Sequence, residues 1–352
     1  MTAADGAAFQ PEAVPLSARG VSVFFPVGSQ VMARVQGEES RLRAVDGVDL
    51  EIGRGEALAL VGESGSGKST LALALCGLRP VDNGEIKLNG TTVTDRRSQA
   101  DRRRVQMVFQ DPYSSLNPRL TVGGVLRELL HVHHVVPRGE VGTESERLLT
   151  LVGLPEEAVG AYPRQFSGGQ RQRIAIARAL ALRPEVLIAD EPVSALDVSV
   201  QATILNLLAS LRAELGLSLL LISHNLAVVR HLCDRVAVMY LGRIVEVAPT
   251  EQLFSDPRHP YTRGLLAAIP RLAAGVPDAE APAISGDPPS PLNIPSGCRF
   301  RTRCPIAQQR CEEEDPELTG AAEVPGHLAA CHFAFAPAPP AGTGLARAGE
   351  QA

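Results

Sequence analysis

Apolar positions along the chain follow two alternating patterns. Short continuous apolar runs, rich in valine, isoleucine and leucine, predict strands that are buried on both faces. These runs occupy residues 56–62, 105–110, 185–191 and 217–224. Longer segments with apolar residues on one face predict helices at 68–78, 167–182 and 199–215. Strands that alternate with helices in this way are typical of an α/β domain with a largely parallel sheet.

The rest of the chain departs from this alternation. Residues 111–167 have helical patterns interrupted by prolines and histidines, which predicts an all-helical subdomain inserted into the α/β core. Proline-rich stretches then lead to a cysteine-containing segment, so we expect 248–335 to form a small C-terminal module. The ends, 1–17 and 336–352, have few large apolar residues and are predicted to be disordered tails. The main domain is then 18–247.

The composition limits the class of protein. The chain has 352 residues, of which 45% are hydrophobic, enough for one large domain and a smaller one. A formal net charge of −5 argues against nucleic acid as a partner. No run approaches the ~20 apolar residues of a membrane span, and the N-terminus lacks the features of a secretory signal. We therefore expect the protein to stay in the cytoplasm.

A glycine-rich segment, GESGSGKST, follows the first predicted strand and precedes a predicted helix. It fits the pattern G-x-x-x-x-G-K-S/T, in which the backbone wraps the phosphates of a nucleotide. Lys68 supplies a mobile positive charge, and Ser69 supplies a hydroxyl for Mg²⁺. The expected binding residues are Gly62, Glu63, Ser64, Gly65, Ser66, Gly67, Lys68, Ser69 and Thr70.

Two carboxylates end the strand predicted at 185–191. The C-terminal ends of strands are where α/β sheets place their ligands. We expect Asp190 to hold Mg²⁺, through water, and Glu191 to polarise the water that attacks the terminal phosphate. An acidic pair at a strand end is by itself weak evidence for a nucleotide site. The phosphate loop in the same chain strengthens that evidence.

The segment FSGGQRQR, residues 166–173, resembles the signature sequence of ATP-binding cassette (ABC) proteins. The phosphate loop, Gln110, SALD at 194–197 and His224 follow in that family's order. The resemblance covers roughly residues 18–334. It implies a P-loop NTPase fold of the ABC nucleotide-binding type, with a RecA-like α/β core, a β-subdomain and an inserted helical subdomain.

The same resemblance implies roles for further residues. In the family, the helix start at the signature faces a nucleotide that the partner subunit holds. The corresponding residues here are Ser167, Gly168, Gly169 and Gln170. Gln110 would contact Mg²⁺ and the attacking water, and His224 would contact the terminal phosphate. Phe25 aligns with the aromatic residue that stacks on adenine, with Phe24 as the alternative, and a plain strand-core role for Phe25 stays open.

Other motifs resemble a narrower group, the ATP-binding subunits of oligopeptide and dipeptide importers. These motifs are QDPYSSLNPRLTV, DEPVSALDVSVQA, HPYTRGLLAAIP and GDPPSPLNIPSGCRFRTRCP. The group implies a subunit on the cytoplasmic face of the membrane that uses ATP and Mg²⁺ to drive peptide uptake. It also implies two transmembrane permeases, a second ABC ATPase subunit and an extracellular solute-binding protein. An unlike second subunit is favoured, and a like one stays open. The helical insert would dock a permease helix, and residues 113–118, next to Gln110, would connect that contact to the nucleotide.

Two alternatives to peptide import stay open at this point. One is import of another small solute, such as a metal chelate or a glutathione-like compound. The other is a soluble ABC ATPase outside transport, although the chain has neither a long coiled-coil insert nor a second cassette.

Four of the six cysteines gather near the C-terminus. They are Cys298, Cys304, Cys311 and Cys331, whereas the other two lie in apolar runs and are expected to be core residues. Because cytosolic thiols stay reduced, the cluster predicts one metal centre. Similar tails in peptide-importer subunits hold a [4Fe-4S] cluster, so the resemblance implies one here; Zn²⁺ and plain reduced thiols are the alternatives. The arginines between these cysteines either offset thiolate charge or lie on the surface.

Overall fold

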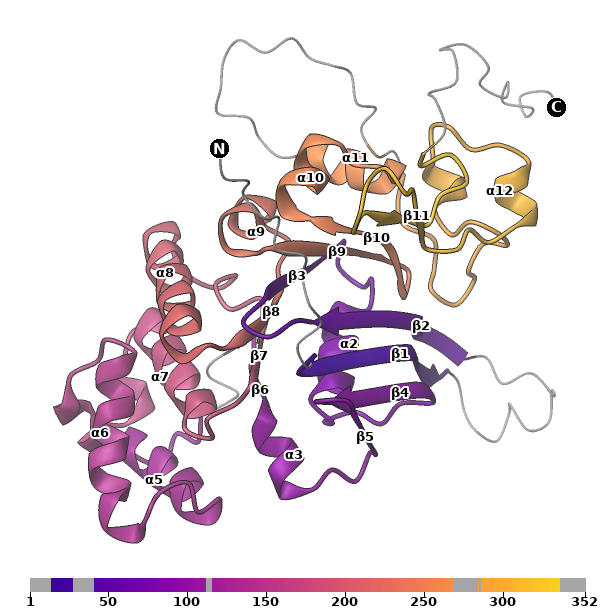
Figure 1. Ribbon diagram of the computed structural model, residues 1–352. Coiled ribbons are helices and arrows are strands. Elements are labelled where there is room, and N and C mark those ends of the chain that lie inside the picture. The colour runs from indigo at the N-terminus through magenta and orange to yellow at the C-terminus, as the bar shows by residue number, and fades with distance from the viewer. Residues whose placement is uncertain (1–13, 28–40, 112–115, 269–283, 285, 336–352) are drawn as a thin grey trace, which may run out of the picture.

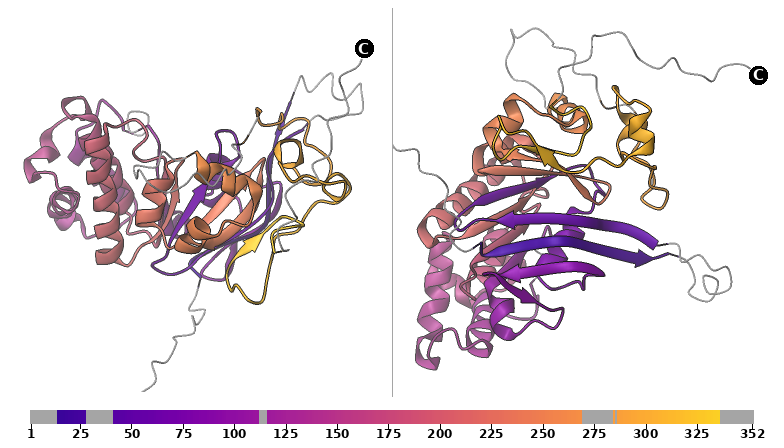
Figure 2. Two further views of the ribbon diagram at one scale, coloured as in Figure 1. Left: turned by 90° about the horizontal axis from the view of Figure 1, so that it is seen from above. Right: turned by 45° about the vertical axis from the view of Figure 1, so that its right-hand side comes forward.

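The computed structural model describes residues 14–27, 41–111, 116–268, 284 and 286–335. Figure 1 shows a helical region at one end, two sheets in the middle and the C-terminal module beside the larger sheet. Figure 2 shows the same arrangement from two further directions.

The larger sheet confirms the four strands predicted from the apolar runs. These are β3 (Ala57–Val61), β6 (Val105–Val108), β7 (Val186–Asp190) and β8 (Ser218–Ile222). They are parallel, in the order β3-β8-β7-β6. Beyond β3 the sheet continues with the parallel strand β9 (Arg235–Tyr240) and the antiparallel strands β10 (Arg243–Pro249), β12 (Leu328–Ala329) and β11 (Thr319–Gly320).

The smaller sheet is antiparallel and matches the β-subdomain that the family resemblance implied. Its strands are β1 (Leu16–Pro26), β2 (Arg41–Ile52), β4 (Asn83–Leu88) and β5 (Thr91–Val93), in the order β2-β1-β4-β5. The apolar runs alone did not single out these strands, because their outward residues are polar. Figure 1 shows this sheet lying against α2 (Lys68–Leu75).

The helices also follow the predicted pattern. Those expected at 68–78, 167–182 and 199–215 are α2, α7 (Gly168–Leu180) and α8 (Val198–Leu215). The described part of the predicted insert, 116–167, contains α5 (Val122–Val132), α6 (Val141–Leu151) and the 3-10 helices η1 (Arg138–Glu140), η2 (Glu156–Gly160) and η3 (Pro163–Gln165). The remaining helices are α3 (Gln99–Arg104), α9 (Leu226–Leu232), α10 (Thr250–Ser255), α11 (Pro260–Ala267), η4 (Arg301–Arg303) and α12 (Arg310–Glu313).

The C-terminal module is less separate than its composition suggested. The predicted boundary before residue 248 is wrong, because it falls inside β10, where Ala248 is paired with Val236 of β9. The module also adds to the main sheet, since β12 pairs with β10. A change in composition marked this segment, but the hydrogen bonds of the sheet run across that change.

Buried polar contacts join the module to β10. Glu246 and His327 are both 0% exposed, and Oε1 of Glu246 lies 2.7 Å from Nε2 of His327. The Glu246 carboxylate also accepts hydrogen bonds from the backbone N–H groups of Arg258 and His259, at 2.7 and 2.9 Å. Burial by itself would raise the pKa of Glu246. The hydrogen bonds from the side chains of His327 and Thr262, together with the two backbone N–H groups, outweigh burial and hold the pKa below its ordinary value.

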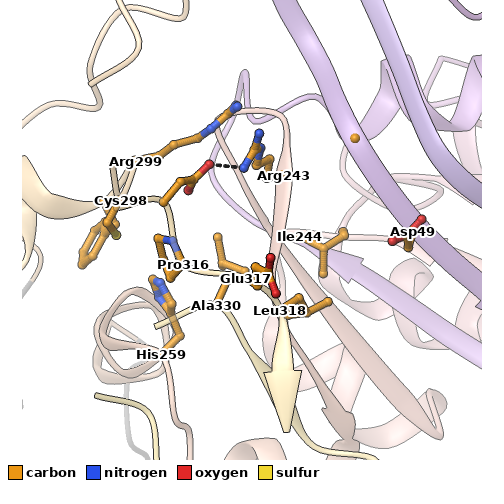
Figure 3. Close-up of a pocket in the computed structure, with 14 residues that line it drawn as sticks. Asp49, Arg243, Ile244, His259, Cys298, Arg299, Pro316, Glu317, Leu318 and Ala330 are labelled. Atoms are coloured by element: carbon orange, nitrogen blue, oxygen red, sulfur yellow. Dashed lines mark hydrogen bonds and ion pairs between the residues drawn. The ribbon is translucent and has the colours of Figure 1, made fainter. Parts of the chain in front are cut away.

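A cavity of about 560 Å³ lies between the module, β2 and β10 (Figure 3). Cys298 and Arg299 reach it from the module, and Arg243 reaches it from β10. Arg243 forms an ion pair with Asp315 of the module. Charged side chains on the cavity wall therefore connect the module to the sheets.

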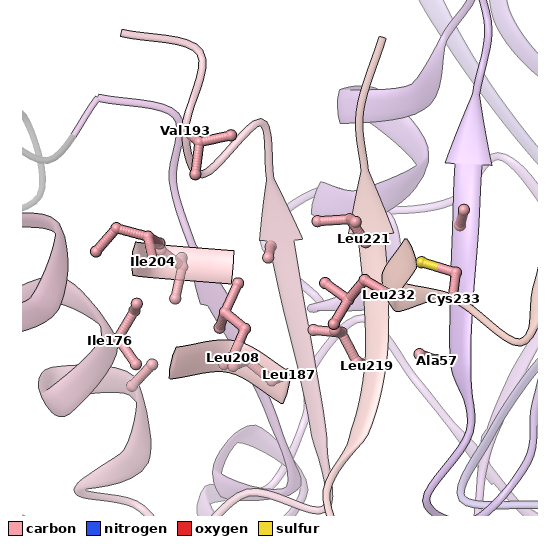
Figure 4. Packing of buried hydrophobic residues seen from close by; sticks show 14 of the residues in the cluster. Ala57, Ile176, Leu187, Val193, Ile204, Leu208, Leu219, Leu221, Leu232 and Cys233 are labelled. Atoms are coloured by element: carbon pink, nitrogen blue, oxygen red, sulfur yellow. The ribbon is translucent and has the colours of Figure 1, made fainter. Parts of the chain in front are cut away.

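The two faces of the parallel sheet have separate apolar cores. On β7, Leu187 and Ala189 face the cluster formed with α7 and α8, whereas Val186 and Ile188 face the cluster that contains α2. Figure 4 shows the first cluster, with Leu187 close to the residues of α8. Because both faces are buried, a slip of one residue in the pairing would exchange the two sets of side chains, so packing specifies the register.

The predicted N-terminal tail, 1–17, is wrong at its end. Leu16 and Ser17 belong to β1 and pair with Ile52 and Glu51 of β2. Residues 1–13 and the second predicted tail, 336–352, lie outside the described residues, as do 113–115 of the segment expected to connect permease and nucleotide. Among the helices described, none is long and apolar enough to cross a membrane.

We expect the free energy of unfolding to fall as the pH is lowered from 7 to 5. His259 is 1% exposed, and burial lowers its pKa from 6.5 to about 4. Its Nδ1 accepts a hydrogen bond from the backbone N–H of Tyr261 at 3.1 Å, which requires a neutral ring. Between pH 6.5 and 4 the unfolded state therefore binds more protons and is favoured, by at most about 1.4 kcal/mol per pH unit for one group.

Thermal melts of the full chain at pH 5, 6 and 7 measure this effect. His259→Asn keeps an acceptor at the start of α11 but does not titrate, so its melting temperature should change less with pH than that of the wild type. His231→Asn, at an exposed position on α9, should keep the wild-type dependence. Equal pH dependence in wild type and His259→Asn would contradict the prediction.

Candidate active site

The glycine-rich segment forms a tight loop between β3 and α2. Gly62 and Gly67 have φ angles of 150° and 106°. A Cβ at Gly62 would lie 2.1 Å from the backbone oxygen of Met239, and one at Gly67 would lie 2.1 Å from that of Ala44. These positions need glycine because the loop backbone touches β9 and β2 directly.

Lys68 lies inside the loop that it follows. Its ammonium donates to the carbonyl oxygens of Gly62 and Glu63, both at 2.8 Å, and to Oγ of Ser66 at 3.3 Å. Burial lowers the pKa of Lys68, whereas the negative charges of Glu191, Asp190 and Glu63 oppose that shift. The loop thus places a buried cation among backbone groups, as a phosphate site requires.

Asp190 and Ser69 meet beside the loop. Asp190 is 6% exposed, and its carboxylate accepts a hydrogen bond from the Ser69 hydroxyl. Burial raises the pKa of Asp190, and the nearby charge of Glu191 raises it further. Its Oδ1 atom is buried without a hydrogen-bond partner. This unpartnered oxygen beside a hydroxyl fits a Mg²⁺ ion whose remaining ligands are waters and phosphate oxygens.

The three predicted catalytic side chains lie together. Nε2 of Gln110 donates to Oε2 of Glu191 at 3.1 Å, and Nδ1 of His224 lies 3.2 Å from Oε1 of the same carboxylate. Gln110, Glu191 and His224 follow β6, β7 and β8, whose ends meet at one edge of the sheet. The sequence predicted Gln110 and His224 only through the family resemblance. It did not predict that Ser194 contacts them, although Nε2 of Gln110 donates to Oγ of Ser194 at 3.4 Å.

Glu191 has an unusual backbone conformation. Its φ angle is 44°, although it is not glycine, and its N–H donates to the carbonyl of Ile222 on β8 at 3.0 Å. A left-handed conformation of this kind costs on the order of 1–3 kcal/mol and is found mostly at functional sites. It turns the chain at the end of β7 so that Asp190 and Glu191 point to different partners.

The signature residues start α7 with an exposed polar cap. Oγ of Ser167 accepts from the N–H of Gln170 at 3.3 Å, and Oε1 of Gln170 accepts from the N–H of Ser167 at 2.9 Å. Gly169 is needed where α7 crosses α8, because a Cβ there would lie 2.4 Å from Cγ1 of Val200. Gly168 lies at the first helical position, where its N–H group can bind an anion.

Phe25 lies near the end of β1 and packs partly against the core of the smaller sheet. The guanidinium of Arg79 lies over its ring, 4.0 Å from the centroid. One face of the ring is therefore covered by this guanidinium. The adenine-stacking role stays a prediction, as does the alternative role for Phe24.

The four C-terminal cysteines are free and lie within one module. The backbone N–H of Cys298 donates to the carbonyl of Cys311 at 2.8 Å. Burial raises the pKa of Cys298 to about 11 and that of Cys304 to about 12, and the other thiols of the cluster add to both shifts. The described residues contain no group of three or more His, Cys, Asp or Glu side chains that could hold a metal ion, so the predicted metal centre is not confirmed.

Sequence reasoning missed two residues that touch the phosphate loop. Tyr261 accepts a hydrogen bond from the N–H of Glu63 at 2.8 Å, and Arg303 pairs with the Glu63 carboxylate at 2.8 and 3.0 Å. Both lie about 200 residues or more from the loop in sequence, so no local pattern indicates the contact. Arg299 and Arg303 thus pair with carboxylates of the main domain, which corrects the expectation that they offset thiolate charge or lie on the surface.

Family models match most of the chain in two pieces. The model described as ABC transporter matches residues 45–194, and the one described as oligopeptide/dipeptide transporter, C-terminal region, matches 245–311. The oligopeptide transport ATP-binding protein AppF of Bacillus subtilis (strain 168) is 45% identical over 323 residues, which cover 90% of this chain and 97% of that protein. A putative peptide import ATP-binding protein of Brucella abortus (strain 2308) is 51% identical over 301 residues, covering 84% of this chain and 89% of that one.

Solved structures resemble the main domain. The ATP-binding cassette MJ0796, in a dimeric post-hydrolysis state bound to ADP and Pi, is 28% identical with a TM-score of 0.58, covering 67% of this chain and 98% of that one. CbiO1 of Clostridium perfringens, part of the ABC transporter complex CbiONQ, is 27% identical with a TM-score of 0.59, covering 70% and 92%.

We expect Gly67→Ala to destabilise the protein and to abolish nucleotide binding. The new methyl group would collide with the carbonyl of Ala44, which belongs to the backbone of β2 and cannot turn aside. Thermal unfolding and the affinity for a fluorescent ATP analogue measure the two effects.

Gly90→Ala is the matched control for this substitution. Gly90 has a φ angle of 77°, but nothing lies within 4 Å of a Cβ there. It therefore carries the backbone cost of a left-handed alanine, about 1–2 kcal/mol, without the collision. The prediction fails if the two variants lose equal stability and both keep nucleotide affinity.

Proposed function

Since the chain belongs to the family of ATP-binding subunits of oligopeptide and dipeptide ABC transporters, we propose that it hydrolyses ATP to drive peptide uptake across the cytoplasmic membrane. The observation that carries the proposal is the contact of Gln110, Glu191 and His224 at the sheet edge that also holds the phosphate loop. The P-loop NTPase fold of the ABC type, expected from the sequence, is confirmed by the relatives and by the solved structures.

Each group of the site has a task in this reaction. Lys68 and the N–H groups at the start of α2 would hold the terminal phosphates, and Ser69 and Asp190 would hold Mg²⁺. The ion supplies charge neutralisation on the phosphate oxygens. Glu191 would accept the proton of the attacking water, Gln110 would orient that water, and His224 would contact the terminal phosphate while it keeps Glu191 in place.

A second ATP-binding subunit would complete the site. The exposed helix start at Ser167–Gln170 offers N–H groups and a positive dipole end to an anion. Figure 1 shows α7 in the helical region and α2 beside the smaller sheet, so these residues would bind a nucleotide held by the partner subunit. The cassette MJ0796 is dimeric in its solved structures. We infer that this chain pairs with a second ABC ATPase subunit.

The permeases would dock on a groove of the α/β core. The groove is lined by the end of α2, by β6 and by α7. Leu78 on its rim is 61% exposed, although it is a large apolar residue. Such a surface fits an apolar helix of a membrane-embedded partner. The complex would include two permeases and an extracellular solute-binding protein, which would place this chain on the cytoplasmic face.

We also propose that Cys298, Cys304, Cys311 and Cys331 hold a [4Fe-4S] cluster. What supports this is that the four cysteines are free and lie in one module, and that four thiolates are the usual ligand set of such a cluster. The bound group would connect four points of the module, at residues 298, 304, 311 and 331.

Iron quantification after anaerobic purification tests the cluster. We expect about four iron atoms per chain, the content of a [4Fe-4S] cluster, and strong loss of iron in Cys304→Ser. Cys76→Ala, outside the module, should keep the iron content of the wild type. A colourless protein that contains zinc and no iron would reject the cluster.

Glu191→Gln tests the proposed reaction. In the transporter assembled with its permeases, we expect ATP hydrolysis and uptake of a labelled peptide to fall by about 100-fold or more, because the general base is lost. Binding of ATP should persist, since Lys68 and the loop are intact. Phosphate release and peptide accumulation in proteoliposomes are the measurements.

The matched control is Glu251→Gln, which removes an exposed carboxylate that pairs with Arg230. It should hydrolyse ATP and transport like the wild type. Undiminished hydrolysis in Glu191→Gln would remove Glu191 from the mechanism. If Glu191→Gln loses hydrolysis but the wild type takes up no peptide, the protein is an ATPase and peptide import is rejected.

A further inference from the structure

The second residue of the phosphate loop, Glu63, is held by the C-terminal module through both its backbone and its side chain. Its N–H donates to Oη of Tyr261 at 2.8 Å. Its carboxylate accepts two hydrogen bonds from the Arg303 guanidinium, at 2.8 and 3.0 Å. Two parallel bonds between these groups define the orientation of the carboxylate as well as its distance.

This contact is sheltered from solvent. The side chain of Arg303 is 7% exposed and that of Glu63 is 27% exposed. Tyr261 is fully buried, and its ring packs against Tyr240 of β9 and Phe300 of the module, with centroid distances of 4.7 and 5.4 Å. The partners of Glu63 are therefore themselves rigidly placed, unlike a surface ion pair between two mobile side chains.

Glu63 is at the same time part of the phosphate site. Its carbonyl oxygen accepts a hydrogen bond from the ammonium of Lys68 at 2.8 Å, and it also accepts from the N–H of Ser66 at 3.2 Å. The residue thus lies between the lysine of the loop on one side and the module on the other. A change in the position of Arg303 would move the carbonyl that orients Lys68.

A second connection runs parallel to the first. Arg299 is next to Cys298. Its guanidinium donates to the carbonyl of Leu241 and pairs with Asp46 of β2. The residue after Leu241 is Gly242, whose N–H donates to the carbonyl of Ser66 in the phosphate loop at 2.9 Å. Figure 3 shows Arg299 and Cys298 together on the wall of the cavity. The cysteine segment therefore supports the loop at two points.

We propose that Arg303 is a positioning residue for ATP: through Glu63 it holds the phosphate loop in its binding conformation, so that the cysteine module is part of the nucleotide site. The inference rests on the proposed role of this loop in ATP binding. Without Arg303 the loop must be ordered by the nucleotide itself, which weakens binding. Gln110, Glu191 and His224 follow other strands and contact one another, so the chemical step should be preserved.

Arg303→Met tests the proposal in the transporter assembled with its permeases. The KM for ATP should rise about tenfold, which corresponds to about 1.4 kcal/mol of binding free energy, whereas kcat should stay within about twofold. Arg303→Lys should recover part of the affinity, because it keeps the charge but cannot form two parallel bonds.

Arg301→Met is the matched control. Arg301 lies in the same 3-10 helix, and its guanidinium donates to Ser296 and Glu312 of the module. This variant removes the same type of side chain from the same segment without touching the loop, so its KM should equal that of the wild type. A similar KM in Arg301→Met and Arg303→Met would overturn the proposal.

Glu63→Gln approaches the contact from the loop and covers the case in which Arg303→Met fails to fold. It should raise the KM for ATP by a similar factor, and the double variant Arg303→Met with Glu63→Gln should be no worse than the single ones. Additive losses would mean that Arg303 does not act through Glu63 and would reject the proposal.

Lys68→Ala separates this inference from the assignment of the site. Loss of ATP binding in Lys68→Ala, together with normal KM in Arg303→Met, would reject the role of Arg303 alone. Normal ATP binding in Lys68→Ala would instead reject the assignment of the phosphate loop.

Discussion

The parallel register of β3, β8, β7 and β6 is the constraint on which the active site depends. Each strand buries both faces, so a shift of one residue would exchange the apolar side chains between two different cores. This register brings the C-terminal ends of three strands to one edge, where Gln110 and His224 reach the two oxygens of Glu191. The catalytic geometry is therefore a consequence of core packing, and the residues that create it are mostly leucine, isoleucine and valine.

The phosphate loop depends on a different constraint, the close approach of backbones. Gly62 and Gly67 allow the loop to touch β9 and β2, and Lys68 fills the interior with a buried charge. Asp190 lies beside it with an oxygen that lacks a partner, at a site where a cation would supply one. A hydrogen bond to that oxygen from the protein would compete with Mg²⁺, so its absence among the described contacts is consistent with the proposed role.

The C-terminal module is joined to the main domain by polar contacts as well as by apolar packing. Two polar pairs each join segments that are more than 80 residues apart. One is the buried pair of Glu246 and His327, and the other is the bidentate pair of Glu63 and Arg303. Removing one partner from such a pair leaves a buried charge without compensation, which is costly. The module is consequently tied to the main sheet and to the phosphate loop, and a bound group at its cysteines would act on a segment that already supports the nucleotide site.

Much of this protein is determined by local sequence. The continuous apolar runs predicted the four central strands, and the glycine-rich and acidic segments predicted the phosphate loop and Asp190 with Glu191, because these features need only a few adjacent residues. The limits of the module were misplaced, since strand pairing between β10 and β12 leaves no trace in composition. Only the tertiary structure decided that Arg303 and Tyr261 hold Glu63: a hydrogen bond across 198 or 240 residues depends on how the whole chain folds, and no spacing in the sequence encodes it.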